Sequence, residues 1–129
     1  ITGIKGYIGN SLKLKFQKKN KIFGISSKTE RLDYKRLLKK NIKPHVIFHC
    51  AGSGLVGIDK ISYLIHKQKN LDSTKKLIKN IKKIKLKKSI IIFLSSQAVY
   101  GKVSSNRISE KNKTLPISDY GKTKFFQII

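Results

Sequence analysis

Two short stretches of the chain are continuously apolar instead of alternating between apolar and polar residues. They are HVIFHCAG at residues 45–52 and SIIIFLSS at residues 89–96. Continuous apolar runs of this length are typical of parallel strands that are buried on both faces of a sheet. Both stretches are therefore predicted to be fully buried strands, and KIFGIS at residues 21–26 is predicted to be a third strand.

Stretches with helical spacing alternate with these strands. Residues 10–19 show a polar helical pattern, and residues 31–41 predict a helix that ends near Pro44. A last helix is predicted from about Ser118, after a loop. The long helix before the second apolar run places six residues on one face: Leu71, Thr74, Leu77, Ile78, Ile81 and Ile84. This alternation predicts an α/β fold with a parallel sheet and right-handed crossovers.

Three glycines stand three residues apart before the first predicted helix, at Gly3, Gly6 and Gly9. The usual dinucleotide-binding pattern is G-x-G-x-x-G, so the first half of this pattern is one residue longer. Glycines allow a tight turn, and the N-terminus of the following helix favours the negative charge of a pyrophosphate. The loop is a candidate phosphate-binding loop, with a plain glycine turn as the alternative. It is expected at the same sheet edge as HCAG and SSQAVYG, where parallel strands end.

Tyr120 and Lys124 stand four residues apart near the start of the last predicted helix, so they share one face. A free phenol has a pKa of about 10, and it acts as a base near neutral pH only if that value falls by about three, which is worth roughly 4 kcal/mol. One cation about 4 Å away supplies roughly 4 kcal/mol at an effective dielectric constant of about 20. The pair is a candidate acid/base site, with an exposed tyrosine and lysine on a lysine-rich helix as the alternative.

The chain of 129 residues carries 30 lysines and arginines against 6 acidic residues, for a net charge of +24. This excess favours a nucleic-acid partner at first sight. Only Arg31, Arg36 and Arg107 are arginines, although arginine is the residue that best reads base edges. The lysines are also spread along the whole chain. The excess is therefore interpreted as a solvated surface combined with coding bias, and a basic nucleic-acid-interacting protein is kept as the alternative class.

Several kinds of site are excluded by composition. Cys50 is the only cysteine, so neither an internal disulfide nor a cysteine-based metal site can form. The three histidines, His45, His49 and His66, show no ligand spacing, so no metal site is predicted and core or surface roles are expected for them. The longest apolar run, IIIFL, is far too short to span a bilayer.

The sequence contains no methionine and ends within a helical pattern. It is interpreted as an internal fragment of a longer chain.

Five motifs occur in order along nearly the whole chain: TGIKGYIG, HCAG, Asn70 in KNLDSTKKL, FLSSQAVYG and SEKNKTLPISDYGKTK. Together they resemble the extended short-chain dehydrogenase/reductase family, and within it the NAD-dependent epimerase/dehydratase branch that acts on nucleotide sugars. The resemblance implies a Rossmann-like doubly wound parallel sheet with helices on both faces, truncated at both ends. Residues 1–129 would then form a partial NAD(P)-binding Rossmann domain, with its first strand cut and its C-terminal substrate-binding part absent. The isolated fragment is therefore expected to be inactive. It also implies hydride transfer with NAD on a nucleotide-sugar substrate, in a cytoplasmic homodimer.

The resemblance implies a role for each matching residue. Tyr120 would be the general acid/base, Lys124 would hold the nicotinamide ribose and favour the phenolate, and Ser96 would hydrogen-bond the reacting sugar oxygen. Asn70 would support the lysine. The residues implied to bind the cofactor are Gly3, Gly6, Tyr7, Ile8, Gly9, Asp33, Ala51, Gly52, Ser95, Tyr120 and Lys124.

Departures from the family pattern narrow the activity. Sugar dehydratases carry an Asp-Glu pair directly after the catalytic hydroxyl, whereas this chain has Gln97 and Ala98, which favours an epimerase or a reductase. Lys28 and Arg31 follow the predicted strand at residues 21–26, where a basic residue can meet a 2′-phosphate, so NADP stands beside NAD as an alternative. A cofactor-binding regulator without chemistry is a further alternative, which the complete set of Ser96, Tyr120 and Lys124 disfavours.

Overall fold

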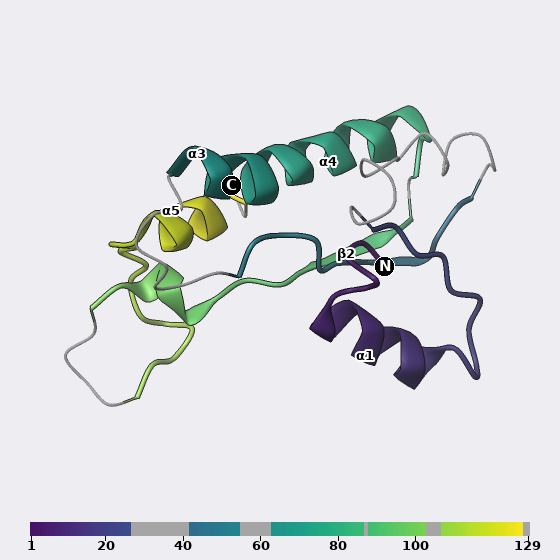
Figure 1. Cartoon of the computed structure of the whole chain (residues 1–129), viewed down its shortest axis with the longest axis horizontal. Helices are drawn as coiled ribbons and strands as arrows, with labels where there is room; N and C mark the ends of the chain where they lie inside the picture. The colour runs from purple at the N-terminus through teal and green to yellow at the C-terminus, as the bar shows by residue number, and fades with distance from the viewer. Residues whose placement is uncertain (27–41, 55–62, 87, 103–106, 128–129) are drawn as a thin grey trace. The chain divides into compact units, whose positions relative to one another are not determined.

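A computed structural model of the chain describes residues 1–26, 42–54, 63–86, 88–102 and 107–127 (Figure 1). The chain divides into two compact units. The first comprises Ile1–Gly52 with Ser73–Leu94, and the second comprises Ser53–Asp72 with Ser95–Ile129. The elements are α1 (Tyr7–Phe16), β1 (Val46–His49), α3 (Tyr63–His66), the π-helix η1 (Lys67–Asp72), α4 (Ser73–Lys83), β2 (Ile90–Phe93), the 3₁₀-helix η2 (Gln97–Tyr100) and α5 (Asp119–Phe125).

The sheet of the first unit is parallel, as predicted. β1 pairs with β2 over four residues, from Val46 opposite Ile90 to His49 opposite Phe93. Thr2 forms isolated parallel bridges to Ile25 on one side and to His49 on the other. The short segment at Thr2 therefore lies between the Ile25 segment and β1.

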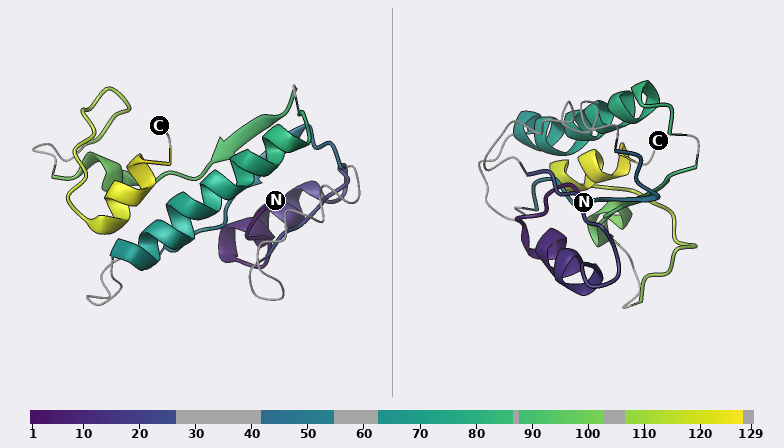
Figure 2. Two further views of the ribbon diagram at one scale, coloured as in Figure 1. Left: turned by 90° about the horizontal axis from the view of Figure 1, so that it is seen from above. Right: turned by 90° about the vertical axis from the view of Figure 1, so that its right-hand side faces the viewer.

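Helices α1 and α4 lie on opposite faces of this sheet (Figures 1 and 2). Leu77 and Ile81 of α4 pack against Ile47 of β1 and form the buried core. On the other face, the ring of Phe16 in α1 stacks on Phe48, with 5.7 Å between the ring centroids. Consecutive strand residues point to opposite faces, which explains why neighbouring residues of β1 serve different helices. The predicted α/β fold with helices on both faces is confirmed.

The prediction that both apolar runs are fully buried strands is wrong. Along β2, Ile90 is 62% exposed and Ile92 is 38% exposed, while Ile91 between them packs against the core. In β1, Val46 is also exposed. Among the described residues, the core covers only one face of β2, so the strand alternates in burial despite its uniform sequence.

Two further predictions differ from the structure in their extent. The segment predicted as a strand at residues 21–26 forms only a bridge at Ile25, where Ile25 N–H donates to Ile1 O at 3.0 Å. Among the described residues, this segment also pairs with the N-terminal segment through Ile4 N–H, which donates to Ile25 O at 3.3 Å. The helix predicted at 10–19 is observed as α1 and begins three residues earlier. The helix predicted at 31–41 lies outside the described residues.

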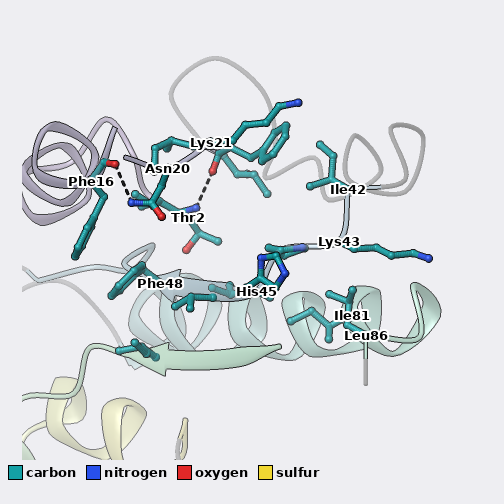
Figure 3. Close-up of a pocket in the computed structure, with 18 of the residues that line it drawn as sticks. Thr2, Phe16, Asn20, Lys21, Ile42, Lys43, His45, Phe48, Ile81 and Leu86 are labelled. Carbon is teal, nitrogen blue, oxygen red and sulfur yellow. Dashed lines mark hydrogen bonds between the residues drawn. The ribbon is translucent and has the colours of Figure 1, made fainter. Parts of the chain in front are cut away.

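An apolar cavity of about 710 Å³ lies within the first unit (Figure 3). Its lining includes Phe16, Phe48 and Ile81, together with His45 directly before β1. Ligands of parallel sheets bind beyond the carboxyl ends of the strands. Because this cavity borders the other end of β1, it is not the candidate functional site.

In the second unit, α5 packs on η2 through a glycine. Gly121 lies so close to Ala98 O that a Cβ atom there would overlap the carbonyl oxygen. The hydroxyl of Ser118 accepts a hydrogen bond from Gly121 N–H at 3.0 Å and caps the N-terminus of α5, which begins close to the predicted start at about Ser118. The cap and the glycine together hold the start of α5 in place.

The core packing leads to the first prediction. Leu77→Ala should lower the free energy of unfolding by about 2–5 kcal/mol, because Leu77 is 1% exposed and its loss leaves a cavity. Leu14→Ala on the exposed face of α1 serves as the matched control and should change it by about 0.5 kcal/mol or less. Chemical denaturation followed by circular dichroism measures both, and equal losses would contradict the assigned core.

Candidate functional site

Two of the three glycines in the N-terminal loop, Gly3 and Gly9, are required by close backbone contacts. Gly3 has a positive φ of 66°, and a Cβ atom there would lie 2.9 Å from the backbone of Cys50 and Ala51. A Cβ atom on Gly9 would overlap Gly3 O. Gly6 N–H donates to Gly3 O at 2.8 Å and closes the turn. The G-x-x-G-x-x-G spacing thus allows the loop to fold against itself and against the segment after β1.

Helix α1 starts directly after this loop. Its N-cap residue, Gly6, supplies no side-chain hydrogen bond, and the first turn contains no acidic residue. Tyr7 and Ile8 in that turn are exposed. The first N–H groups of a helix have no partner within the helix and carry a partial positive charge. This loop and helix can therefore bind an anionic group through backbone N–H donors.

A buried hydrogen-bond chain holds the residue before Gly3. Thr2 Oγ1 lies 2.7 Å from His49 Nδ1, and His49 Nε2 lies 2.9 Å from Thr74 Oγ1. Thr2 Oγ1 also accepts a hydrogen bond from Ala51 N–H at 3.1 Å. Sequence reasoning expected only a core or surface role for His49 and assigned no site role to Thr2 or Thr74.

Asn70 is the centre of a hydrogen-bond network in the second unit. Its side chain is completely buried within η1. Its Oδ1 accepts from Ser53 N–H at 2.8 Å, and its Nδ2 donates to Thr123 Oγ1 at 3.1 Å. Its backbone oxygen accepts from Gln127 Nε2 at 3.0 Å. π-turns are rare and occur frequently at functional sites, and this one places Asn70 between the Ser53 segment and α5.

Tyr120 and Lys124 lie next to one another on α5. Lys124 Nζ is 5.9 Å from the centroid of the Tyr120 ring, and Lys124 is only 8% exposed. Thr123 Oγ1 donates to Tyr120 O at 2.8 Å, so the network of Asn70 extends to the turn that carries the tyrosine. The His66 ring meets the Tyr120 ring edge-on at 5.7 Å. The mostly buried Lys124 thus places a positive charge beside the ring of the partly buried Tyr120.

Ser95 and Ser96 follow the end of β2. Ser96 Oγ accepts a hydrogen bond from Ala98 N–H at 3.2 Å and caps η2. A hydroxyl that accepts one hydrogen bond still has a proton to donate. Since η2 packs on α5 at Gly121, Ser96 belongs to the same unit as Tyr120.

The structure sorts the predicted site residues into two groups. Gly3, Gly6, Tyr7, Ile8, Gly9, Ala51 and Gly52 belong to the first unit, and Asn70, Ser95, Ser96, Tyr120 and Lys124 belong to the second. Asp33 lies outside the described residues, as do Lys28 and Arg31. The support of Lys124 by Asn70 remains a prediction, because the contact given for the Asn70 amide on α5 is with the adjacent Thr123.

Sequence reasoning missed Thr123 and His66. Thr123 is fully buried and joins Asn70 to the Tyr120 backbone. A polar residue three positions after Tyr120 lies on the same side of a helix, and this spacing was the available signal. His66 is buried against Tyr120, and in the described part of the chain its Nδ1, like Ser53 Oγ, has no hydrogen-bond partner. No local signal in the sequence marks that contact.

The described residues give no sign of two other kinds of site. They include no cluster of three or more histidine, cysteine, aspartate or glutamate side chains that could hold a metal ion. Within the same residues, no helix is both long enough and apolar enough to cross a membrane.

A parallel sheet with helices on both faces and a glycine-rich loop directly before a helix define a dinucleotide-binding type of α/β domain. The sequence model of the NAD dependent epimerase/dehydratase family matches residues 1–128, so the chain belongs to this family. No curated protein matches the chain.

Solved structures share the fold. The UDP-N-acetylglucosamine 4-epimerase of Methanobrevibacter ruminantium M1, in complex with UDP-N-acetylmuramic acid, is 26% identical with a TM-score of 0.82, over 98% of this chain and 46% of that one. The UDP-glucose 4-epimerase of Bifidobacterium longum, in complex with NAD⁺ and UDP, is 25% identical with a TM-score of 0.84, over 98% and 45%. A dTDP-4-dehydrorhamnose reductase from Clostridium acetobutylicum has the same fold at 22% identity and a TM-score of 0.82, over 98% and 46%. The chain thus spans slightly less than half the length of these proteins.

The hydrogen bonds of Asn70 lead to the second prediction. Asn70→Ala should destabilise the protein by about 1–3 kcal/mol for each buried group left without a partner, chiefly Ser53 N–H and Thr123 Oγ1. The control is Asn80→Ala on α4, where the lost hydrogen bond to Lys76 O is exposed. Thermal and chemical unfolding measure both variants. An Asn70→Ala protein as stable as the Asn80→Ala protein would contradict the network.

Proposed function

We propose that this chain is part of an NAD-dependent nucleotide-sugar epimerase or reductase that uses Ser96, Tyr120 and Lys124. The observation that carries the proposal is the mostly buried Lys124 beside the Tyr120 ring, in a chain of this family. A lysine is rarely buried without a role, because burial of an ammonium group costs free energy. A positive charge beside a phenol is the arrangement that a tyrosine base requires.

The glycine loop fits an NAD pyrophosphate. Gly3 and Gly9 leave no space for side chains, and the first turn of α1 offers N–H donors with no acidic residue to repel phosphate. In the proposed site, the backbone of Gly3, Gly6, Tyr7, Ile8 and Gly9 would hold the pyrophosphate, and Asp33, Ala51, Gly52 and Ser95 would contact the rest of the cofactor. NAD is favoured because the B. longum epimerase was solved with NAD⁺, and NADP remains the alternative that Lys28 suggests.

The mechanism follows from the chemistry of the three side chains. The bound cofactor would supply a hydride acceptor and donor. Tyr120, as the phenolate, would remove the proton from a hydroxyl of the sugar, and Lys124 would stabilise its negative charge. Ser96 would donate a hydrogen bond to the same sugar oxygen and orient it. An epimerase would then re-protonate the oxygen from Tyr120 after hydride return to the other face, and a reductase would perform only that second half.

Dehydration is disfavoured at this site. Elimination of water needs an acid and a base beside the reacting carbons. The two positions after Ser96 are Gln97 and Ala98 in η2, and neither side chain can transfer a proton at neutral pH. The proposal is therefore an epimerase or a reductase.

The proposal extends to the substrate and to the assembly. The relatives of known structure act on or bind UDP- and dTDP-sugars, which supports a nucleotide sugar as the substrate class. We further propose a cytoplasmic homodimer that forms through the helices around Asn70 and Tyr120. Exposed apolar side chains on these helical segments, Leu64, Ile65 and Phe126, support such a contact.

The third prediction tests the tyrosine. In the full-length enzyme, Tyr120→Phe should lower kcat by about 10²–10⁴-fold, because the ring remains but the proton-transfer group is lost. Its affinity for NAD⁺, measured by calorimetry, should change little. Tyr63→Phe, the same change at the start of α3, is the control and should keep its turnover. Full activity in Tyr120→Phe would remove the assignment.

The fourth prediction concerns the extent of the catalytic unit. We propose that residues 1–129 form part of a Rossmann domain and that further residues complete the substrate site, since the chain covers only 46% of the M. ruminantium epimerase. Residues 1–129 alone should therefore show no turnover of UDP-sugars in an assay in which the full-length protein is active. Robust turnover by residues 1–129 would contradict this proposal.

A further inference from the structure

Three polar side chains are buried together in the first unit. Thr2 and His49 are each 2% exposed and Thr74 is 4% exposed. They come from three separate segments: the residue before Gly3, the last residue of β1 and the second residue of α4. The hydrogen bonds described above join them in the order Thr2, His49, Thr74.

This arrangement is not what packing alone requires. The His49 ring contacts the Phe93 ring edge-on at 5.5 Å, a contact that an aromatic hydrocarbon side chain would also make. Buried polar groups lower stability unless they are hydrogen-bonded, and a satisfied network favours one geometry over others. The polar atoms of His49 therefore specify a position in addition to filling space.

The chain of hydrogen bonds couples its two ends. A neutral imidazole has one N–H donor and one acceptor nitrogen, so with a neutral His49 ring one threonine hydroxyl donates to the ring and the other accepts from it. Thr2 Oγ1 already accepts a hydrogen bond from Ala51 N–H. Whether the Thr74 hydroxyl donates to or accepts from the ring therefore affects which of the two roles the Thr2 hydroxyl adopts.

Thr2 contacts both segments that position the glycine loop: it directly precedes Gly3, and it hydrogen-bonds to the segment at the end of β1. Its backbone N–H donates to Phe48 O at 3.0 Å, and its hydroxyl holds Ala51, against which Gly3 packs. A change in the position of Thr2 would shift Gly3 and Ala51 relative to each other. These are two of the residues proposed to contact the cofactor.

We propose that His49 is a positioning residue for the glycine loop, which it holds through Thr2. Thr74 on α4 in turn holds the His49 ring in place. The inference rests on the proposed cofactor site. None of the three side chains needs to touch the cofactor, because they act by holding Gly3 and Ala51 at the separation that the pyrophosphate requires.

The test, which is the fifth prediction, compares NAD⁺ binding by calorimetry across variants of the full-length protein. Thr74→Val removes only the distant hydroxyl from a residue of the same shape and should raise the Kd for NAD⁺ about fivefold or more. Thr74→Ser restores the hydroxyl and should bind like the wild type, which a purely structural role of the methyl group would not predict. If Thr74→Val does not fold, Thr74→Ala takes its place.

Two further comparisons distinguish an effect transmitted through the hydrogen bonds of His49 from a general loss of stability. His49→Phe keeps the ring contact with Phe93 but loses both nitrogens, and it should weaken NAD⁺ binding at least as much as Thr74→Val. The same change at the exposed His45 is the matched control and should have no effect. In the Thr2→Val/Thr74→Val double variant, the loss should be smaller than the product of the single losses, since either change breaks the same chain.

The outcomes distinguish the two proposals. Wild-type protein that does not bind NAD⁺ would overturn the proposed cofactor, whatever the variants do. Wild-type binding together with a Kd within twofold in Thr74→Val and His49→Phe would overturn the positioning role alone. Multiplicative losses in the double variant would also overturn it, because they would show that the two threonines act independently.

Discussion

The contact of α4 with β1 through Ile47, Leu77 and Ile81 determines the geometry of the first unit. Residues two apart in a strand point to the same face, so His49 lies on the same face as Ile47. Residues three apart in a helix also share a face, so Thr74 lies one turn before Leu77 on the buried side of α4. Once the three aliphatic side chains are packed, His49 and Thr74 must meet, and burial then requires them to hydrogen-bond. The hydrogen bonds that join Thr74, His49 and Thr2 therefore follow from the way the apolar residues of β1 and α4 align in the core.

The second unit depends on a buried amide instead of an aliphatic core. Asn70 hydrogen-bonds to the backbone N–H of Ser53 and to the side chains of Thr123 and Gln127, on or beside α5. It lies in the π-turn of η1 and uses both its side chain and its backbone oxygen. Such a network is costly when it is incomplete, so it favours one arrangement of the helix that carries Tyr120 and Lys124. Placement of reacting groups is what proximity catalysis requires. The support of the proposed acid/base pair thus lies in residues that perform no chemistry themselves.

Much of the candidate site could be predicted because it depends on neighbours in the chain. The glycine spacing, the four-residue interval between Tyr120 and Lys124 and the start of the last helix near Ser118 each express local backbone geometry, which is the same in any protein. Features that depend on distant segments could not be predicted in this way. The exposure of Ile90 and Ile92 depends on which elements cover β2, and the hydrogen-bonded role of His49 depends on Thr2 and Thr74, which lie 47 and 25 residues away. The bond between Asn70 and Thr123 spans 53 residues.

The sequence by itself determined the alternation of strands and helices, the family of the chain and the identity of the residues that could carry chemistry. Those properties follow from residue types at short, regular spacings, where backbone geometry leaves few choices. Only the tertiary structure decided which buried polar groups are paired, that Thr123 and His66 adjoin the Tyr120 turn, and that the glycine loop packs on Cys50 and Ala51. Hydrogen bonds act over about 3 Å, and the chain must fold before residues so distant in sequence come within that range.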